Sequence, residues 1–230
     1  MSDDLSNNET MHVDLLNNEL LGVKKFLGVI SPKLTLIYGP MFSGKTTKLI
    51  ELYNLTTLSV NKNKCLVINY ALDQRYGKNK IITHDGLELD CYSILNLSTI
   101  IENPSKFNLY NVDYIFINEG QFFENIHIHV KLLLDFYKKN VIICGLNLDY
   151  KKEPFGTMMN LIEYTHEIYK LSGTCATPYC KCPSIYSHRI VKNNSQILIG
   201  SSEYIPLCEK CYTKANLKLD NSEEYLIIDY

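Results

Sequence analysis

A glycine-bounded loop between an apolar run and an amphipathic segment is the feature that most constrains this fold. Residues 34–38, "LTLIY", are apolar enough for a buried strand, and residues 45–56, "KTTKLIELYNLT", space their apolar side chains as a helix does. The loop between them contains Gly39, four further residues, and then Gly44-Lys45-Thr46. This is the complete Walker A pattern in its required context, and it predicts a phosphate-binding loop.

The residue types of this loop suit phosphate. Glycines let backbone N–H groups turn toward phosphate oxygens, and the following helix presents its positive end to them. Lys45 would neutralise the β- and γ-phosphates, and the Thr46 hydroxyl would ligate Mg²⁺. An incidental glycine turn is the alternative. The loop residues predicted to bind ATP are Gly39, Pro40, Met41, Phe42, Ser43, Gly44, Lys45, Thr46 and Thr47.

Three further apolar runs continue the same pattern. They are "KCLVINY" (64–70), "DYIFINE" (113–119) and "NVIICGLN" (140–147), and residues 122–139 between the last two have helical spacing. Strands that alternate with helices predict parallel βαβ units. The expected fold class is therefore α/β, with a P-loop NTPase-like core around a parallel sheet.

An acidic residue ends one of these predicted strands. Glu119 closes "YIFINE", at the carboxyl end of the sheet beside the phosphate loop. P-loop folds place a metal-organising or catalytic carboxylate there. A solvated strand-end glutamate is the alternative, and the strand context alone does not decide between them.

Five of the eight cysteines crowd one segment near the C-terminus. The spacing Cys175-x4-Cys180 and Cys208-x2-Cys211 allows four thiolates to converge tetrahedrally on a structural Zn²⁺. Cys182 could also reach the metal. Alternating runs at 185–191 and 196–200 flank a polar "KNNS" and predict a β-hairpin near this site.

Composition narrows the classes of protein. The 230 residues are 46% hydrophobic and 21% charged, with a formal net charge of -2, which is typical of a globular protein and argues against direct nucleic-acid binding. No stretch approaches the roughly 20 apolar residues of a membrane span, and the N-terminus lacks the order of a signal peptide. We therefore expect a cytoplasmic protein without membrane contact.

Changes in character along the chain predict four parts. Residues 1–32 form an N-terminal extension, disordered or with one short helix from Met11 to Gly22. Residues 33–171 form the P-loop α/β domain, and residues 172–214 form the zinc-binding part. Residues 215–230 form a tail whose apolar "YLII" packs on the core or a partner, or frays.

Several motifs in a fixed order carry a resemblance to a known family. The stretches "GPMFSGKTT", "YALDQRY", "THDG", "NEGQFF", "PFG" and the cysteine pairs resemble thymidine kinases of the cellular, zinc-containing type, over about residues 33–214. The resemblance implies transfer of the γ-phosphoryl group of ATP to the 5′-hydroxyl of thymidine, and in some members of deoxyuridine. It also implies a homo-oligomer, with a tetramer favoured, and feedback inhibition by dTTP.

The same resemblance implies catalytic roles. Glu119 would be the base toward the 5′-hydroxyl, and Arg75 would spread charge on the moving phosphoryl group together with Lys45. Asn118 stands where the family usually has Asp. This departure predicts either weaker affinity for Mg²⁺ or a larger share of its binding by Thr46 and Asp73. Asp73 matches the acidic neighbour of the family arginine, here Arg75. Beyond the loop, the residues implied to bind ATP are Asp73, Asn118 and Gln121.

In the family, a loop called the lasso, carried on the zinc site, holds the nucleoside base. Ser187 occupies a position where the family commonly has Thr. This difference predicts that the chain tolerates 5-substituents on the pyrimidine base slightly differently. The family spacing to "YSHR" favours Cys180 over Cys182 as the zinc ligand. The residues implied to bind the nucleoside are Met41, Phe122, Leu146, Tyr150, Ser187, Ile199, Gly200, Ser201 and Tyr204.

Two other classes compete with this interpretation. A zinc-bearing nucleic-acid module with an accessory ATPase would show a basic stripe, and this chain shows none. A regulatory GTPase-like switch would carry an Asn-Lys-x-Asp-type base reader, which "GLNLDYKK" does not provide.

Overall fold

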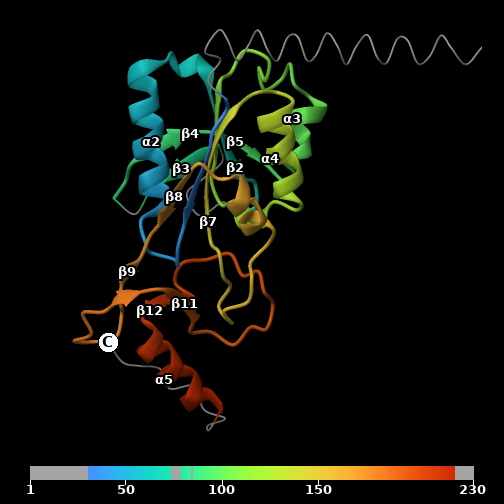
Figure 1. Ribbon diagram of the computed structural model, residues 1–230. Helices are drawn as coiled ribbons and strands as arrows, with labels where there is room; N and C mark the ends of the chain where they lie inside the picture. Colours follow the sequence, from blue (N-terminus) through green and yellow to red (C-terminus); the bar gives the residue numbers. More distant parts are fainter. Residues whose placement is uncertain (1–30, 74–78, 84, 221–230) are drawn as a thin grey trace, which may run out of the picture. The chain divides into compact units, whose positions relative to one another are not determined.

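Six strands form one parallel sheet at the centre of the fold (Figure 1). The computed structural model describes residues 31–73, 79–83 and 85–220. The sheet order is β5-β2-β6-β7-β1-β8. Its strands are β1 (Leu34–Tyr38), β2 (Cys65–Tyr70), β5 (Tyr92–Ile94), β6 (Tyr114–Ile117), β7 (Asn140–Gly145) and β8 (Glu167–Lys170). The predicted helix at 11–22, Arg75 and the "YLII" segment lie outside the described residues.

The four central strands were predicted and the two edge strands were not. β1, β2, β6 and β7 are covered on both faces, so they are near-continuous apolar runs that can be recognised in the sequence. β8 lies at one edge and has mostly exposed side chains, and β5 at the other edge is only three residues long. Neither edge strand has an apolar run.

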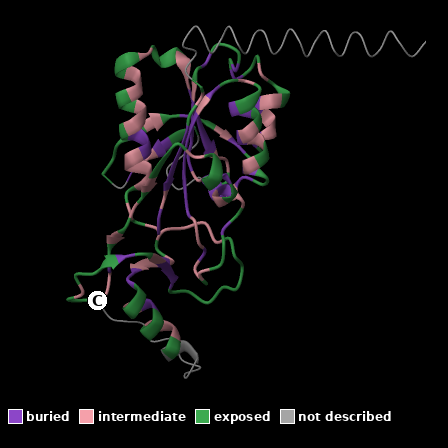
Figure 2. Cartoon of the chain, in the orientation of Figure 1, coloured by how far each residue is buried: buried purple, intermediate pink, exposed green. Residues whose placement is uncertain are grey.

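Helices cover both faces of the sheet, and Figure 2 shows the buried residues gathered between them. On one face α2 (Lys45–Ser59) buries Leu49 and Ile50 against Ile37 and Phe116. On the other face, α4 (Ile126–Asp135) buries side chains such as Val130 in a second cluster. The remaining helical elements in this core are α3 (Ser98–Glu102) and the 3₁₀ turns η1 (Lys62–Lys64), η2 (Gly120–Phe122) and η3 (Met158–Tyr164).

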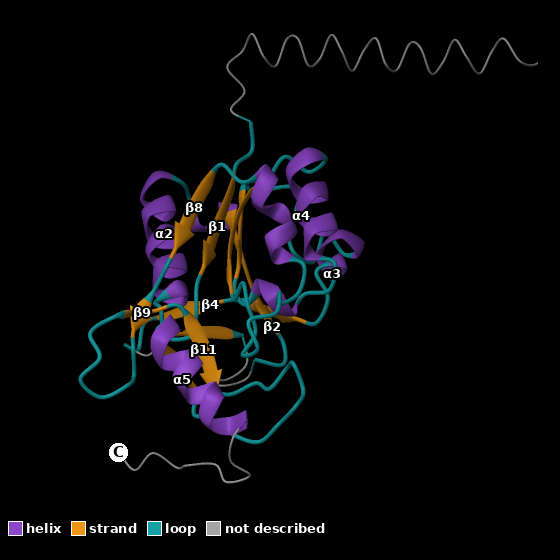
Figure 3. Cartoon of the chain, turned by 60° about the horizontal axis from the view of Figure 1, so that its bottom comes forward, coloured by secondary structure: helices purple, strands orange, loops and turns teal. Residues whose placement is uncertain are grey.

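Residues 172–214, which are predicted to bind zinc and are called the zinc-binding part below, lie beyond the carboxyl ends of the strands. Figure 3 brings them forward. Three antiparallel pairs complete the structure: β3 (Lys80–Ile82) with β4 (Glu88–Asp90), β9 (Gly173–Thr174) with β10 (Pro183–Ser184), and β11 (Tyr186–Arg189) with β12 (Tyr204–Leu207). Helix α5 (Glu209–Asp220) follows, so it crosses the predicted boundary at residue 214. The described residues from Pro32 onward form one compact unit, and the division near residue 171 stays a prediction.

The predicted second strand of the hairpin, at 196–200, is wrong. The partner of β11 is β12, and residues 190–203 form a long loop, here named the lasso loop. The Arg189 guanidinium accounts for the difference, because it binds the backbone carbonyls of Ser195 and Gln196 and so removes them from strand pairing.

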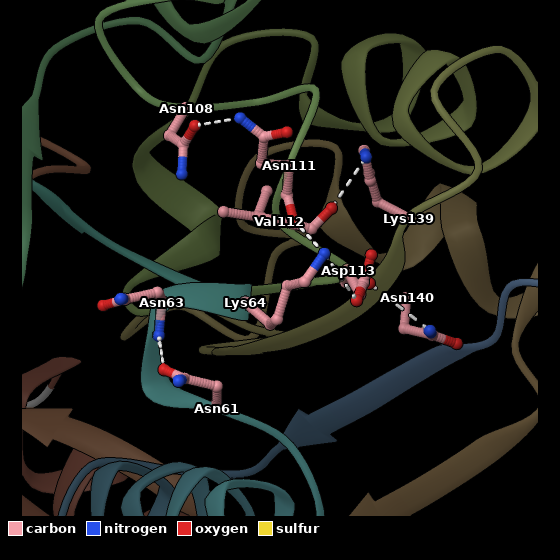
Figure 4. Close-up of polar contacts among 9 residues, drawn as sticks. All are labelled: Asn61, Asn63, Lys64, Asn108, Asn111, Val112, Asp113, Lys139 and Asn140. Carbon is pink, nitrogen blue, oxygen red and sulfur yellow. Dashed lines mark hydrogen bonds and ion pairs between the residues drawn. The ribbon is translucent and has the colours of Figure 1, made fainter.

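A polar network closes the amino end of the sheet (Figure 4). The buried Lys139 donates from Nζ to the Val112 carbonyl at 2.7 Å, and Lys64 lies 3.5 Å from the Asp113 carboxylate. Asn140 donates from Nδ2 to the Asp113 carbonyl. We name these five residues the amino-end network. Its side chains tie the starts of β2, β6 and β7 together.

Among the described residues, every helix is too short or too polar to cross a lipid bilayer.

Candidate active site

A cavity of about 260 Å³ opens at the carboxyl edge of the sheet, between the phosphate loop and the lasso loop. Parallel α/β sheets bind ligands at this edge. The predicted residues that line the cavity are Met41, Phe42, Ser43, Gly44, Lys45, Thr46, Thr47, Asp73, Asn118, Glu119, Gln121, Phe122, Leu146, Tyr150, Ser187, Ile199, Gly200 and Tyr204. Gly39, Pro40 and Ser201 lie in the adjoining loop segments instead, and Arg75 is outside the described residues.

The phosphate loop requires its two glycines. Gly39 has φ 157°, and a Cβ there would lie 2.3 Å from the Leu171 carbonyl oxygen, while Gly44 has φ 80° immediately before α2. Lys45 folds back over the loop, and its Nζ donates to the Pro40 carbonyl at 2.6 Å. The loop therefore places an ammonium group and a helix N-terminus at the same wall of the cavity.

Glu119 is held in an uncommon backbone conformation, with φ 55°. Such a conformation in a residue with a side chain is strained and occurs preferentially at functional sites. Its Oε2 accepts a hydrogen bond from Gln121 Nε2 at 2.6 Å, and Gln121 Oε1 accepts one from the Leu146 backbone N–H at 2.9 Å. Gln121 thus joins the carboxylate to the part of the cavity wall formed by the end of β7.

Oxygen ligands suited to Mg²⁺ lie next to the loop. Thr46 Oγ1 and Asn118 Oδ1 are 3.5 Å apart, and the buried Asp73 lines the same cavity. Cys144 Sγ donates to the same Asn118 oxygen at 2.9 Å. Burial raises the pKa of Cys144 to about 12, so this thiol is a protonated donor at neutral pH.

Aromatic rings also line the cavity. Phe122 stacks on Tyr70 with ring centroids 5.1 Å apart and meets Phe155 edge-on at 5.4 Å. A flat pyrimidine fits such a wall. Phe155 also lines the cavity. It was not among the residues predicted to bind the nucleoside, although its motif "PFG" was part of the resemblance.

Arg189 organises the lasso loop and was missed by the sequence analysis. Its guanidinium carbon lies 3.7 Å from the Tyr150 ring centroid, and Nη2 donates to the Tyr204 hydroxyl at 2.6 Å. Both tyrosines were assigned to substrate, and both also hold this arginine. The sequence offered one signal for this role, because Arg189 lies within the alternating run at 185–191. In the structure its side chain is 5% exposed. Arg189 also donates to the backbone carbonyls of Asn193, Ser195 and Gln196.

Side-chain contacts tie the zinc-binding part to the core, and two hydrogen bonds among them join residues that line the cavity. Ser187 Oγ accepts a hydrogen bond from the Met41 N–H of the phosphate loop at 2.9 Å. Gln196 of the lasso loop donates from Nε2 to the buried Asp149 carboxylate at 2.9 Å. The phosphate loop is therefore connected directly to β11, and the lasso loop to the segment that follows β7.

Four cysteines converge in the zinc-binding part. The Sγ atoms of Cys175, Cys180, Cys208 and Cys211 all lie within 4.8 Å of one another. Cys180 lies 3.9 Å from Cys208 and 3.8 Å from Cys211. A tetrahedral Zn²⁺ with Zn–S bonds of about 2.3 Å separates its sulfurs by about 3.8 Å, so the cluster could hold zinc. The exposed Cys182 is not part of it.

Comparison with known proteins agrees with this geometry. Residues 32–212 match the family model for thymidine kinase. A thymidine kinase of Bacteroides thetaiotaomicron is 35% identical over 186 residues, which cover 80% of this chain and 88% of that protein. A thymidine kinase of Pseudothermotoga lettingae is 34% identical over 82% of this chain and 98% of its own length. Thymidine kinase 1 of Dictyostelium discoideum is 34% identical, with 80% and 78% covered. This chain belongs to the thymidine kinase family.

Proposed function

We propose that the cavity at the carboxyl edge of the sheet is where this chain phosphorylates thymidine. The reaction is the ATP-dependent conversion of thymidine to dTMP. The γ-phosphorus of ATP forms a bond with the 5′-oxygen of thymidine, and its bond to the departing ADP breaks. The 5′-hydroxyl loses its proton in the same process.

Glu119 is the base that takes this proton. The observation that carries the assignment is that its carboxylate, held by Gln121, lines the same cavity as Lys45 and the phosphate loop. A carboxylate in this position orients the hydroxyl and receives its proton as the P–O bond forms. Glu119 has a left-handed backbone conformation, which is found preferentially at functional sites. This supports its assignment as the base.

Lys45 and the N–H groups of the loop stabilise the charge on the transferred group. Arg75 is assigned a similar role from the family resemblance alone. Mg²⁺, when bound with ATP, neutralises charge on the β- and γ-phosphate oxygens. Thr46, Asn118 and Asp73 supply the oxygen ligands that this ion prefers, directly or through water. The side chain of Asn118 is neutral, which suits a residue that acts on the ion through the Thr46 hydroxyl or through a water molecule.

The nucleoside occupies the aromatic side of the cavity. Phe122 offers a ring face for the pyrimidine, and Leu146, Tyr150 and Tyr204 complete the slot. The lasso-loop backbone near Ile199, Gly200 and Ser201 offers the polar groups that distinguish one base from another. The four clustered cysteines would hold Zn²⁺, which would fix the strands that carry this loop.

Three further properties stay predictions, and the family resemblance implies the first two of them. We propose a homo-oligomer, with a tetramer favoured, and inhibition by dTTP bound across both walls of the cavity. We also propose a cytoplasmic location, to which eight cysteines free of disulfides are suited.

The experiment measures phosphoryl transfer from Mg·ATP to thymidine, deoxyuridine, deoxycytidine and deoxyguanosine, with Glu119→Gln beside the wild-type protein. We expect transfer to thymidine, and a loss in kcat of about 10²- to 10⁴-fold in the variant with ADP binding unchanged. Wild-type levels of kcat in Glu119→Gln would exclude this residue as the base. Phosphorylation of no nucleoside by a protein that binds ATP would contradict the proposed reaction.

A further inference from the structure

Asn118 belongs to a network whose other members have no part in the proposed reaction. Its Nδ2 donates to Asn69 Oδ1 at 2.9 Å, and its Oδ1 accepts the hydrogen bond from Cys144. The three residues come from β2, from the end of β6 and from β7, which are neighbours in the sheet. Asn118 is 3% exposed, Asn69 2% and Cys144 1%. The network is therefore shielded from bulk water, although Asn69 and Asn118 border the cavity.

The two partners impose one orientation on the Asn118 amide. A thiol is a weak donor and a weaker acceptor, so the carbonyl oxygen of Asn118, and not its NH₂ group, pairs well with Cys144. Asn69 Oδ1 then accepts the Asn118 NH₂ on the other side. The reverse orientation would direct the N–H donors of Asn118 at the sulfur and at Thr46, and Asn69 would have to turn over with it to keep two amide oxygens apart. A buried N–H would then face a sulfur that is only a weak acceptor, which costs more than that contact contributes.

This orientation has a consequence for Thr46. The Asn118 oxygen lies 3.5 Å from Thr46 Oγ1 and is the acceptor for that hydroxyl. A hydroxyl that donates toward Asn118 directs its lone pairs elsewhere, and Thr46 lines the cavity. An Asn118 amide turned the other way would instead donate to Thr46 and occupy one of those lone pairs.

We infer that Asn69 and Cys144 are positioning residues for the Mg·ATP site, because they hold the Asn118 oxygen toward Thr46 and leave the Thr46 lone pairs available to a cation. Neither residue contacts substrate in this assignment. The inference rests on the proposed function, since it takes the phosphate loop to bind ATP together with Mg²⁺. It explains how a neutral residue serves beside a divalent cation, because correct orientation of its dipole replaces part of the attraction that a carboxylate would provide.

The test follows the Mg²⁺ concentration needed for half-maximal binding of mant-ADP, a fluorescent ADP analogue, to the full chain without thymidine. Cys144→Ala removes the donor, and we expect it to raise this concentration about ten-fold. Cys144→Ser retains a hydroxyl donor and is expected to stay within about two-fold of the wild-type value. Asn69→Leu replaces the acceptor by an apolar side chain of similar size. We expect it to raise the Mg²⁺ concentration as Cys144→Ala does.

Cys91→Ala is the matched control. Cys91 is a second buried cysteine of the same hydrophobic cluster and lies beside the sheet, and its removal is expected to leave the Mg²⁺ requirement unchanged. Thermal unfolding of each variant separates a loss of folding from a loss of metal affinity. A purely structural Cys144 would make Ala and Ser equivalent, or Ser worse, because a hydroxyl is more costly to bury than a methyl group.

The outcomes distinguish this inference from the proposed function. If wild-type protein binds mant-ADP with Mg²⁺ dependence but Cys144→Ala and Cys144→Ser behave alike, the positioning role is overturned and the proposed function stands. If the wild-type protein fails to bind the nucleotide, or binds it equally without Mg²⁺, the assignment of a Mg·ATP site is overturned and the inference with it.

Discussion

The two ends of the parallel sheet carry similar residue types in different surroundings. At the amino end, Lys139 donates to the Val112 carbonyl, and the Lys64 ammonium lies beside Asp113. At the carboxyl end, Lys45 and Glu119 line a cavity. The amino-end network is made of contacts within the protein, so its lysines serve stability. The carboxyl end adds an open volume and a helix N-terminus, so its lysine can serve chemistry. The surroundings of a charged residue, more than its type, decide its role.

The largest expected effect separates the two ends by activity. Lys45→Met is expected to lower kcat for thymidine phosphorylation by about 10²- to 10³-fold, because a cation aimed at the transferred phosphoryl group is lost. The matched change at the other end, Lys139→Met, is expected to leave kcat unchanged. Steady-state kinetics on both variants check this. Equal losses in the two variants would remove the functional distinction between the ends.

A second substitution measures how far activity at the carboxyl end of the sheet depends on the zinc-binding part. Cys208→Ser removes one clustered thiolate, and we expect zinc content, measured by metal analysis, to fall. Because the lasso loop then loses its position, kcat/KM for thymidine should fall about 100-fold. Binding of mant-ADP should change little, since the phosphate loop belongs to the core. A parallel loss of ADP affinity would show that the two walls of the cavity do not behave separately.

The smallest effect concerns the stability contributed by the amino end. Lys139→Met leaves the buried Val112 carbonyl without its donor, which should lower the free energy of unfolding by about 1–3 kcal/mol. Burial lowers the pKa of Lys139, with Asp113 opposing and Lys64 reinforcing the shift. Chemical denaturation of both proteins at several pH values measures the difference.

The direction of the pH dependence follows from that pKa shift. The unfolded chain keeps the Lys139 proton to a higher pH than the folded protein does, so the folded state gains stability as pH rises through the lowered pKa toward 10.5. The advantage of wild type over Lys139→Met should therefore grow with pH in this range. An advantage that shrinks would mean that the buried lysine is stabilised in its charged form.

The central strands and the phosphate loop were predictable because local residue patterns encode them. β1, β2, β6 and β7 are buried on both faces and so are near-continuous apolar runs. The edge strands β5 and β8 lack that pattern. The partner of β11 was predicted wrongly because "ILIG" at 197–200 resembles a strand, whereas Arg189 holds the adjoining carbonyls of the lasso loop.

The candidate site divides in the same way. Local patterns were enough to predict the strand, loop and helix around Lys45, the strand-end position of Glu119 and the spacing of the cysteines, because each depends on residues near one another in the chain. The meeting of Asn69, Asn118 and Cys144 became visible in the folded chain alone. They are separated by 49 and 26 residues and come together because β2, β6 and β7 are adjacent in the sheet. Contacts across strands depend on sheet order and register, which no local pattern specifies.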